Sequence, residues 1–219
     1  MNYEDILACD LKDEVNHCLD SSEHERKKKM EVLKTKIDGL LIIKPDVYHD
    51  VRGYLFEQYN QMKYRDIGLV HKFVQDNCSY SRYGTIRGLH YQVGDSAQGK
   101  LANVLDGRVF DVAVDIRFGS PTFGQYIAVE LTSENNLQFW IPPGFAHGLS
   151  VLSETAVFSY KCTSHYSKDN ERFILFNDPD LAIDWQVTNP IVSQKDLEAR
   201  SFRSIAKDFF FNPEPNQIQ

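Results

Sequence analysis

The chain has 219 residues, of which 42% are hydrophobic and 25% charged, so it can bury a folded core and does not have the composition of a disordered protein. Its formal net charge of −7 argues against a general nucleic-acid binder, although a few local cations could still hold a diphosphate. The four cysteines form no Cys-x-x-Cys pair and no apolar run reaches membrane-spanning length, so we expect a reduced, cytoplasmic protein without nucleic-acid or membrane partners.

Residues 1–34 differ in pattern from the rest of the chain. Apolar residues recur at helical spacing between Ile6 and Leu19, and a run of charges follows from His24 to Lys29. The pattern predicts an N-terminal extension that forms a solvent-exposed surface helix. A helix that binds a partner is the alternative.

The centre of the chain is predicted to consist of short strands separated by turn residues. The expected strands run from Ile37 to Ile43, Tyr54 to Tyr59, Lys72 to Tyr80, Leu101 to Leu105, Arg108 to Arg117, Gln125 to Thr132, Leu137 to Ile141 and Thr155 to Cys162. Asp106-Gly107 is the strongest two-residue hairpin signal. Many short strands and little helical period favour an all-β sandwich or barrel.

Three segments follow from this pattern. We expect the extension to end at residue 34, a β core to span 35–187, and a C-terminal segment to occupy 188–219. In that last segment, Ser193 to Lys207 is expected to form a short helix and Asn212 to Gln219 a frayed tail.

The stretch Arg87-Gly88-Leu89-His90-Tyr91-Gln92, followed by Gln98-Gly99-Lys100, is the candidate site for chemistry. It places a histidine near two fixed cations, Arg87 and Lys100. Because histidine gains and loses a proton near neutral pH, the arrangement suits an anionic substrate with an acidic C–H bond. A buried, hydrogen-bonded core histidine is the ordinary alternative.

Further motifs stand in order along the chain. They are Arg52-Gly53, Phe73-Val74-Gln75-Asp76-Asn77, Val109-Phe110-Asp111-Val112-Ala113-Val114-Asp115, Ser120-Pro121-Thr122-Phe123-Gly124, Trp140-Ile141-Pro142-Pro143-Gly144-Phe145-Ala146-His147-Gly148, Tyr160-Lys161-Cys162-Thr163 and Asn177-Asp178-Pro179-Asp180-Leu181-Ala182-Ile183-Asp184-Trp185. Together with the His90 stretch they resemble the dTDP-4-dehydrorhamnose 3,5-epimerases of bacterial sugar-nucleotide metabolism, from about Thr35 to Lys207.

The resemblance implies a cupin-type jelly-roll β-barrel with short flanking helices. It also implies a homodimer in which an N-terminal segment of each subunit crosses to complete the partner's site. The implied substrate is dTDP-4-dehydro-6-deoxy-D-glucose, whose C3 and C5 centres are inverted without a cofactor or a metal, in dTDP-L-rhamnose or related sugar-nucleotide biosynthesis.

The resemblance also assigns four catalytic roles. His90 matches the base, Asp196 the carboxylate that supports its protonated form, Lys100 the cation at the enolate oxygen, and Tyr160 the acid on the opposite face. Each residue has a structural alternative: Asp196 lies three residues after Ser193 and could belong to a helix cap, Tyr160 could be a core tyrosine, and Lys100 could be solvent-exposed.

Substrate-binding positions carry over in the same way, with Tyr166 matching an aromatic that stacks on the thymine base. The expected set is Arg52, Glu57, Gln75, Asn77, Arg87, His147, Tyr166, Glu171 and Lys195. Arginine suits a diphosphate because its fork meets two oxygens at once. A surface ion pair is the alternative for Arg52 and Glu57.

The chain departs from the family pattern in its N-terminal extension, at His165 beside Tyr166, and at Tyr54-Leu55 after Arg52-Gly53. Three other functions remain as alternatives. One is a mono-epimerase acting at C3 or C5 alone, another is a metal-dependent cupin enzyme, and the third is a non-catalytic sugar-nucleotide binder. The absence of any His-x-His pair argues against the metal-dependent cupin.

Overall fold

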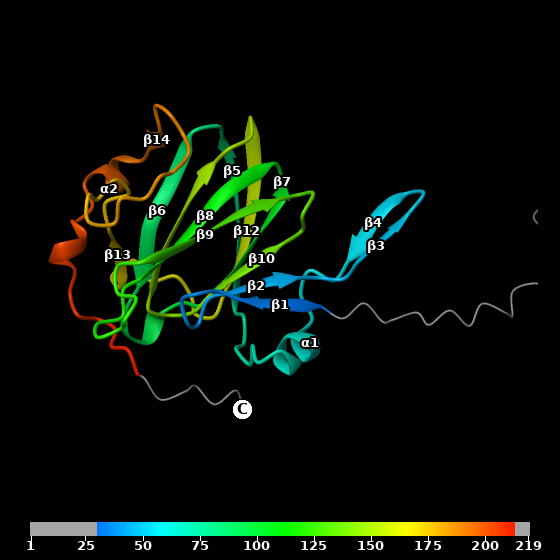
Figure 1. The fold of residues 1–219 in the computed structure, drawn as a ribbon, viewed down its shortest axis with the longest axis horizontal. Coiled ribbons are helices and arrows are strands. Elements are labelled where there is room, and N and C mark those ends of the chain that lie inside the picture. Colours follow the sequence, from blue (N-terminus) through cyan, green and yellow to red (C-terminus); the bar gives the residue numbers. More distant parts are fainter. Residues whose placement is uncertain (1–29, 213–219) are drawn as a thin grey trace, which may run out of the picture.

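Two antiparallel β-sheets packed face to face form the body of the protein in this computed structural model, which describes residues 30–212 (Figure 1). The first sheet contains, in spatial order, β1 (Glu31–Lys34), β2 (Leu41–Lys44), β10 (Gln138–Ile141), β7 (Lys100–Asp106), β12 (Thr155–Cys162) and β5 (Gln75–Arg82). The second contains β13 (Glu171–Phe173), β6 (Thr85–Gln92), β11 (Phe145–Val151), β8 (Arg108–Asp115) and β9 (Tyr126–Thr132), and β14 (Ile191–Val192) pairs with β6 in parallel. The arrangement confirms the predicted all-β jelly-roll barrel.

The remaining elements are short. They are the hairpin of β3 (Val47–Asp50) and β4 (Gly53–Phe56), the helices α1 (Gln61–Asp66) and α2 (Gln194–Leu197), and two single 3₁₀ turns at Gly94–Ser96 and Phe202–Ser204. No helix within residues 30–212 is long and apolar enough to cross a membrane.

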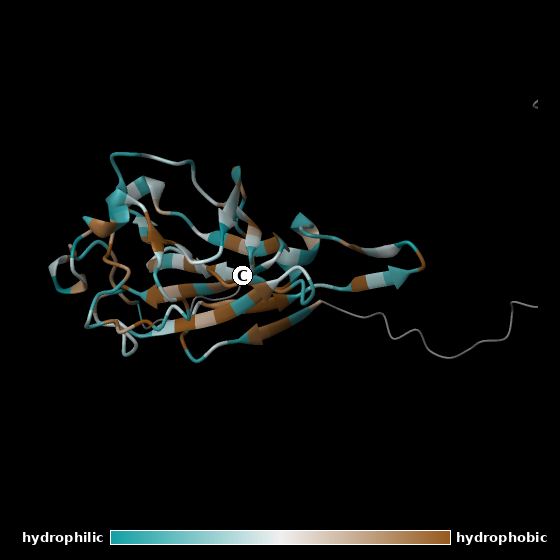
Figure 2. Cartoon of the chain, turned by 90° about the horizontal axis from the view of Figure 1, so that it is seen from above, coloured by the Kyte–Doolittle hydropathy of each residue, from teal (hydrophilic) through white to brown (hydrophobic). Residues whose placement is uncertain are grey.

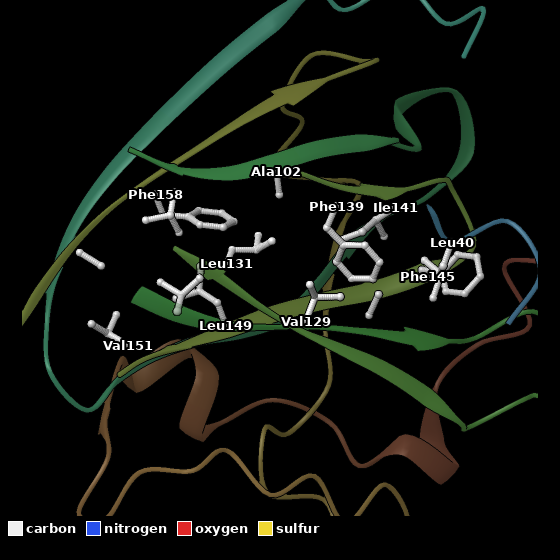
Figure 3. Close-up of a cluster of buried hydrophobic side chains, with 14 of the residues drawn as sticks. Leu40, Ala102, Val129, Leu131, Phe139, Ile141, Phe145, Leu149, Val151 and Phe158 are labelled. Atoms are coloured by element: carbon white, nitrogen blue, oxygen red, sulfur yellow. The ribbon is translucent and has the colours of Figure 1, made fainter. Parts of the chain in front are cut away.

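Side chains from both sheets interdigitate to make the main core (Figure 3). The first sheet contributes Ala102, Phe139 and Phe158, and the second contributes Leu131 and Leu149. All five are at most 3% exposed, and burying a large apolar side chain contributes about 1.5–3 kcal/mol. The core occupies the space between the sheets, so any cavity there must be bordered by residues on the inward-facing side of a strand.

Strand β8 is buried on both faces. Val109 and Ala113 belong to the core between the sheets, whereas Val112 and Val114 belong to a second hydrophobic cluster that also includes Ile183. Because side chains alternate along a strand, Asp111 and Asp115 share the inward face with Val109 and Ala113. Strand β8 is therefore covered on both sides, and the carboxylates of Asp111 and Asp115 point into the interior of the protein.

The Asp106-Gly107 turn does not make a hairpin, so that prediction was wrong. It joins β7 to β8, which lie in different sheets. Gly107 has φ +80°, and a Cβ there would stand 2.2 Å from the carbonyl oxygen of Thr155. The dipeptide therefore identifies a tight turn correctly, but the chain crosses between sheets instead of folding back on itself.

The N-terminal boundary and several elements also differ from the expectation. β1 lies within the segment 1–34, so the sheet begins before residue 35. The helix predicted between Ile6 and Leu19 lies outside the described residues, as does the tail beyond residue 212. The expected strand from Ile37 starts only at Leu41 because Gly39, with φ +96°, turns the chain first. The C-terminal helix is confined to four residues.

The β3–β4 hairpin projects from the body of the protein (Figure 1), and it does so again when the molecule is viewed from above (Figure 2). Its large apolar side chains Tyr48, Val51, Tyr54 and Leu55 are all exposed. Among residues 30–212, no other element covers these apolar side chains, and exposed apolar surface of this kind is typical of protein interaction sites.

Candidate active site

A cavity of about 480 Å³ opens between the two sheets. Its polar lining consists of Ser79, Thr85, Arg87, His90, Lys100, His147, Tyr160, Ser193, Lys195 and Asp196, and its apolar lining of Ile86, Leu149, Phe158, Ile191 and Val192. Four predicted catalytic residues, His90, Lys100, Tyr160 and Asp196, therefore border one cavity, although they come from β6, β7, β12 and α2.

His90 and Asp196 form a hydrogen-bonded pair. The distance from His90 Nε2 to Asp196 Oδ1 is 2.6 Å, and the Asp196 side chain is 4% exposed. Burial raises the pKa of Asp196, but its hydrogen bond to His90 and the charge of that ring, with smaller contributions from Ser193 and Gly88, lower the pKa overall. Asp196 is therefore an ionised carboxylate that can accept a hydrogen bond from the imidazole of His90.

The structure agrees in part with both roles suggested for Asp196, as the partner of His90 and as a residue of a helix cap. Ser193 caps α2, and its Oγ accepts a hydrogen bond from the backbone N–H of Asp196 at 3.2 Å. The cap uses only the backbone of Asp196, so the carboxylate remains available to His90. The helix start therefore positions the carboxylate instead of competing for it.

Two glycines allow β6 and β11 to approach closely beside the pair. A Cβ on Gly88 would lie 2.5 Å from the Cα of Gly148. His90 and His147 are partners in the register of these strands, so both imidazoles border the cavity from the second sheet. Any larger residue at Gly88 would push the two strands apart and move the base.

Phe173 lies beside the base on β13, where it is the register partner of His90. The two rings meet edge to face, with centroids 5.2 Å apart. Lys195 Nζ lies 4.1 Å from the centroid of the same phenyl ring. Phe173 therefore packs against the imidazole of His90, and the ammonium of Lys195, which also borders the cavity, lies over the same phenyl ring.

Lys100 and Tyr160 border the cavity from the first sheet. Lys100 is 8% exposed, which excludes the solvent-exposed alternative. Burial lowers the pKa of Lys100, while Cys162 and Asp111 act to raise it. Burial raises the pKa of Tyr160, so its phenol keeps its proton and can donate it. His90 on one sheet and Tyr160 on the other thus place an imidazole and a protonated phenol on two sides of the cavity.

His147 lines the cavity and forms a second histidine–carboxylate pair. Its Nε2 lies 2.6 Å from Oδ1 of Asp111, whose side chain is fully buried. From the sequence, His147 was predicted to bind substrate, and no role was predicted for Asp111 or Phe173. A signal for Asp111 existed, since an aspartate in the middle of an apolar strand is rarely buried without a partner.

Other predicted binding residues form a cluster beside the cavity. Glu171 Oε2 accepts hydrogen bonds from Tyr166 Oη at 2.8 Å and from Lys195 Nζ at 2.7 Å. The backbone N–H of Tyr166 bonds to Gln75 Oε1 at 2.8 Å, and Gln75 Nε2 bonds to Asn77 Oδ1 at 3.1 Å. Of this cluster, only Lys195 lines the cavity itself.

The fold does not bring Arg52 and Glu57 into the cavity of their own chain. Arg52 pairs with Asp50 on the hairpin, and Glu57 pairs with Lys63 of α1. Both residues therefore belong to surface ion pairs, as the alternative suggested, although their partners are Asp50 and Lys63 and not each other. Arg87 does line the cavity, and its Nε donates to Ser81 Oγ at 3.0 Å.

Within residues 30–212, no three His, Cys, Asp or Glu side chains come together in a group that could hold a metal ion.

Comparisons with known proteins agree with the geometry. A model of the dTDP-4-dehydrorhamnose 3,5-epimerase family matches residues 34–204. The dTDP-4-dehydrorhamnose 3,5-epimerase of Shigella flexneri is 49% identical over 182 residues, which cover 83% of this chain and 99% of the relative.

Solved structures of related enzymes have the same fold. The dTDP-6-deoxy-D-glucose-3,5-epimerase of Legionella pneumophila, in complex with dTDP-4-keto-L-rhamnose, is 48% identical with a TM-score of 0.80 and covers 84% of this chain and 99% of its own. A 3′-monoepimerase of Streptomyces bikiniensis, in complex with dTDP-quinovose, is 30% identical with a TM-score of 0.73. The match covers 77% of this chain and 86% of the monoepimerase chain. The chain belongs to the dTDP-4-dehydrorhamnose 3,5-epimerase family.

Proposed function

We propose that the cavity between the sheets is an active site that inverts C3 and C5 of dTDP-4-dehydro-6-deoxy-D-glucose, giving dTDP-4-dehydro-6-deoxy-L-mannose for dTDP-L-rhamnose biosynthesis. The observation that carries the proposal is the His90–Asp196 pair, which faces a cavity that Tyr160 borders from the opposite sheet. Family membership and the Legionella pneumophila complex with dTDP-4-keto-L-rhamnose support the substrate class.

The chemistry requires three groups around the sugar ring. The C4 ketone acidifies the hydrogens on C3 and C5, because either carbanion delocalises onto the ketone oxygen as an enolate. His90 removes the proton, and Asp196 stabilises the imidazolium that forms. A positioned base of this kind commonly accelerates proton transfer by roughly 10²–10⁴-fold.

Lys100 and Tyr160 complete the cycle. The ammonium of Lys100 stabilises the negative charge on the enolate oxygen, as a donor in an oxyanion hole does. Tyr160 then delivers its phenolic proton to the carbanion from the face opposite His90. Because the new C–H bond forms on the other face, each cycle inverts one carbon. It leaves His90 protonated and Tyr160 deprotonated, and proton exchange with solvent restores both groups before the second carbon reacts.

The rest of the substrate is held by cations and an aromatic ring. Arg87 and Lys195 border the cavity and suit the diphosphate, and His147 lines the same wall. Tyr166 stands exposed at the edge, where a base could stack on its ring, with Gln75, Asn77 and Glu171 holding it in place.

Arg52 and Glu57 serve the cavity of a second subunit in this proposal. The projecting hairpin, with Tyr48, Val51 and Leu55 exposed, supports a homodimer in which the segment carrying Arg52 crosses to the partner. The described cysteines, Cys78 and Cys162, are free thiols, which fits an enzyme of the cytoplasm.

A second candidate function is inversion at one carbon only. The 3′-monoepimerase of Streptomyces bikiniensis has the same fold with a TM-score of 0.73, so the fold by itself accommodates both outcomes. A metal-dependent cupin enzyme and a non-catalytic binder are not favoured by the relatives that this chain matches.

The test is conversion of dTDP-4-dehydro-6-deoxy-D-glucose by the purified protein and by His90→Ala, followed by NMR of the product. Wild type should yield the L-manno product, and His90→Ala should lose at least about three orders of magnitude in rate with the fold intact. A rate for His90→Ala within tenfold of wild type would remove His90 as the base. Circular dichroism of both proteins separates lost chemistry from lost fold.

A further inference from the structure

Asp111 is a carboxylate buried behind the cavity with one oxygen unused. Oδ1 lies 2.6 Å from His147 Nε2, but Oδ2 is the one buried side-chain oxygen or nitrogen in residues 30–212 that has no hydrogen-bond partner. A buried charge is costly unless an opposite charge balances it. The position of Asp111 therefore calls for a cation nearby.

Lys100 is the cation that faces Asp111 across the interior. Lys100 shares the inward face of β7 with Ala102 and Val104, and Asp111 shares the inward face of β8 with Val109. These apolar neighbours belong to one core cluster, so the two charged side chains point into the same space from opposite sheets. Both are at most 8% exposed.

The other ionisable groups around Lys100 are engaged elsewhere or are neutral. They are Arg87 and His90 on β6, His147 on β11, Tyr160 and Cys162 on β12, Glu171 on β13, and Lys195 and Asp196 on α2. Glu171 holds Lys195 at 2.7 Å and Asp196 holds His90 at 2.6 Å. Burial raises the pKa of the Cys162 thiol, so that group is uncharged near pH 7.

The protonation state of His147 determines whether this ring brings a positive charge to Asp111. Burial lowers the pKa of His147, and Asp111 opposes that shift without reversing it. His147 is therefore neutral near pH 7, and its Nε2–H donates to Oδ1 of Asp111. A neutral donor orients the carboxylate but brings no positive charge to it.

We propose that Asp111, oriented by His147, is the counter-charge that keeps Lys100 in its ammonium form. Asp111 touches no substrate in this arrangement and is a positioning residue for the enolate step. The inference rests on the proposed function, in which Lys100 faces the enolate oxygen. Without Asp111, a lysine this deeply buried would release its proton more readily, and a neutral amine would stabilise an oxyanion far less.

The experiment is an NMR titration of Lys100 in protein labelled with ¹³Cε-lysine, with the signal assigned by its absence in Lys100→Arg. Asp111→Asn keeps an oxygen that can accept from His147 and removes only the charge. We expect Lys100 to be charged at pH 7.5 in wild type, and Asp111→Asn to lower its titration midpoint by at least about one pH unit.

Glu171→Gln is the matched control, because it removes a carboxylate that already holds another lysine. It should move the Lys100 midpoint by less than about 0.3 pH units. With substrate, Asp111→Asn should lower kcat, shift its alkaline limb to lower pH and change KM by less than about threefold.

Three results would overturn the proposal: a neutral Lys100 at pH 7.5 in wild type, an unchanged midpoint in Asp111→Asn, or an equal shift in Glu171→Gln. The wild-type titration decides the first point even if Asp111→Asn does not fold. Because the titrations use no substrate, they are independent of whether the proposed epimerisation occurs.

Discussion

The cavity between the sheets and the β3–β4 hairpin both carry residues predicted for the site, but a single chain brings together only those in the cavity. In the cavity, the Asp196 side chain is 4% exposed and lies 2.6 Å from His90, a residue 106 positions away. On the hairpin, the Arg52 side chain is 86% exposed and pairs with Asp50, two residues away. The His90–Asp196 pair is thus assembled by long-range topology, whereas Arg52 stands apart from the cavity of its own chain.

This contrast predicts different kinds of defect. Substitutions in the cavity should act on kcat within each subunit, because the groups there are already in contact. Substitutions on the hairpin should act on substrate binding and should be rescued by a second subunit. The following predictions are ordered from the largest expected effect to the smallest.

Asp196→Asn should lower kcat by about 10²–10³-fold, because an amide cannot stabilise the imidazolium of His90 by charge. The cap of α2 should survive, since Ser193 bonds to the backbone N–H of residue 196. The measurement is kcat together with the free energy of unfolding. Ser193→Ala is the control and should lower stability by about 0.5–2 kcal/mol with a much smaller effect on kcat. The capping interpretation would win if Asp196→Asn lost stability while its rate stayed near wild type.

Tyr160→Phe should separate proton removal from inversion. The base and the cation at the enolate oxygen remain, so substrate in D₂O should still exchange hydrogen for deuterium. Inversion should fall by at least about tenfold, because reprotonation then returns from the original face. NMR of recovered substrate and product measures the ratio of exchange to inversion. Tyr166→Phe, which alters an exposed tyrosine at the edge of the cavity, should leave that ratio unchanged. Inversion at full speed in Tyr160→Phe would remove this residue from the mechanism.

Arg52→Ala should raise KM by about tenfold with a smaller change in kcat, as expected for the loss of one charged hydrogen bond to substrate. Arg108→Ala is the control, because Arg108 is an exposed arginine that faces Glu130 at 3.9 Å and does not line the cavity. Only Arg52→Ala should affect KM.

Subunit mixing sharpens the same comparison. A mixed dimer of Arg52→Ala and His90→Ala subunits contains one cavity with an intact His90 that receives an intact Arg52 from its partner. Mixing should therefore restore a low KM in part of the sites. If mixing leaves the KM of Arg52→Ala unchanged, the hairpin does not serve the partner's cavity.

Acid stability gives the smallest effect. The pKa of Asp196 is lowered in the folded protein, so its contribution to stability is present above the unfolded value of about 3.9 and is lost as pH falls through the folded value. At pH 6, Asp196→Asn should be less stable than wild type by about 1–2 kcal/mol, the order of a hydrogen bond to a charged group. Urea unfolding at pH values from 6 to 3 should show this difference narrowing below about pH 4. A difference that stays constant with pH would contradict the role assigned to the carboxylate.

Local patterns in the sequence predicted the strands well where both periodicity and turn residues agreed. The strand expected from Thr155 to Cys162 has the same bounds as β12, because its alternation is uninterrupted and the chain turns on both sides. Asp106-Gly107 misled because a turn signal describes four residues and says nothing about which sheet the next strand joins.

Residue types alone indicated the stretch with Arg87, His90 and Lys100, but Tyr160 and Asp196 were predicted only through resemblance to a family. No local rule connects His90 to Asp196, since their contact depends on how β6 and α2 meet in the folded chain. Asp111 was passed over because its neighbours on β8 read as an ordinary alternating strand, and only the buried, unpartnered oxygen reveals its charge as a feature of the site. Arg52 could not be placed by one chain at all, because its proposed site lies on another.

The most direct test of the account is wild-type turnover in D₂O with the product examined by NMR at C3 and C5. If one base and one opposing acid serve both carbons, the product should be inverted at both centres and carry solvent deuterium at each. A product inverted and deuterated at only one carbon would contradict the account and make the protein a mono-epimerase.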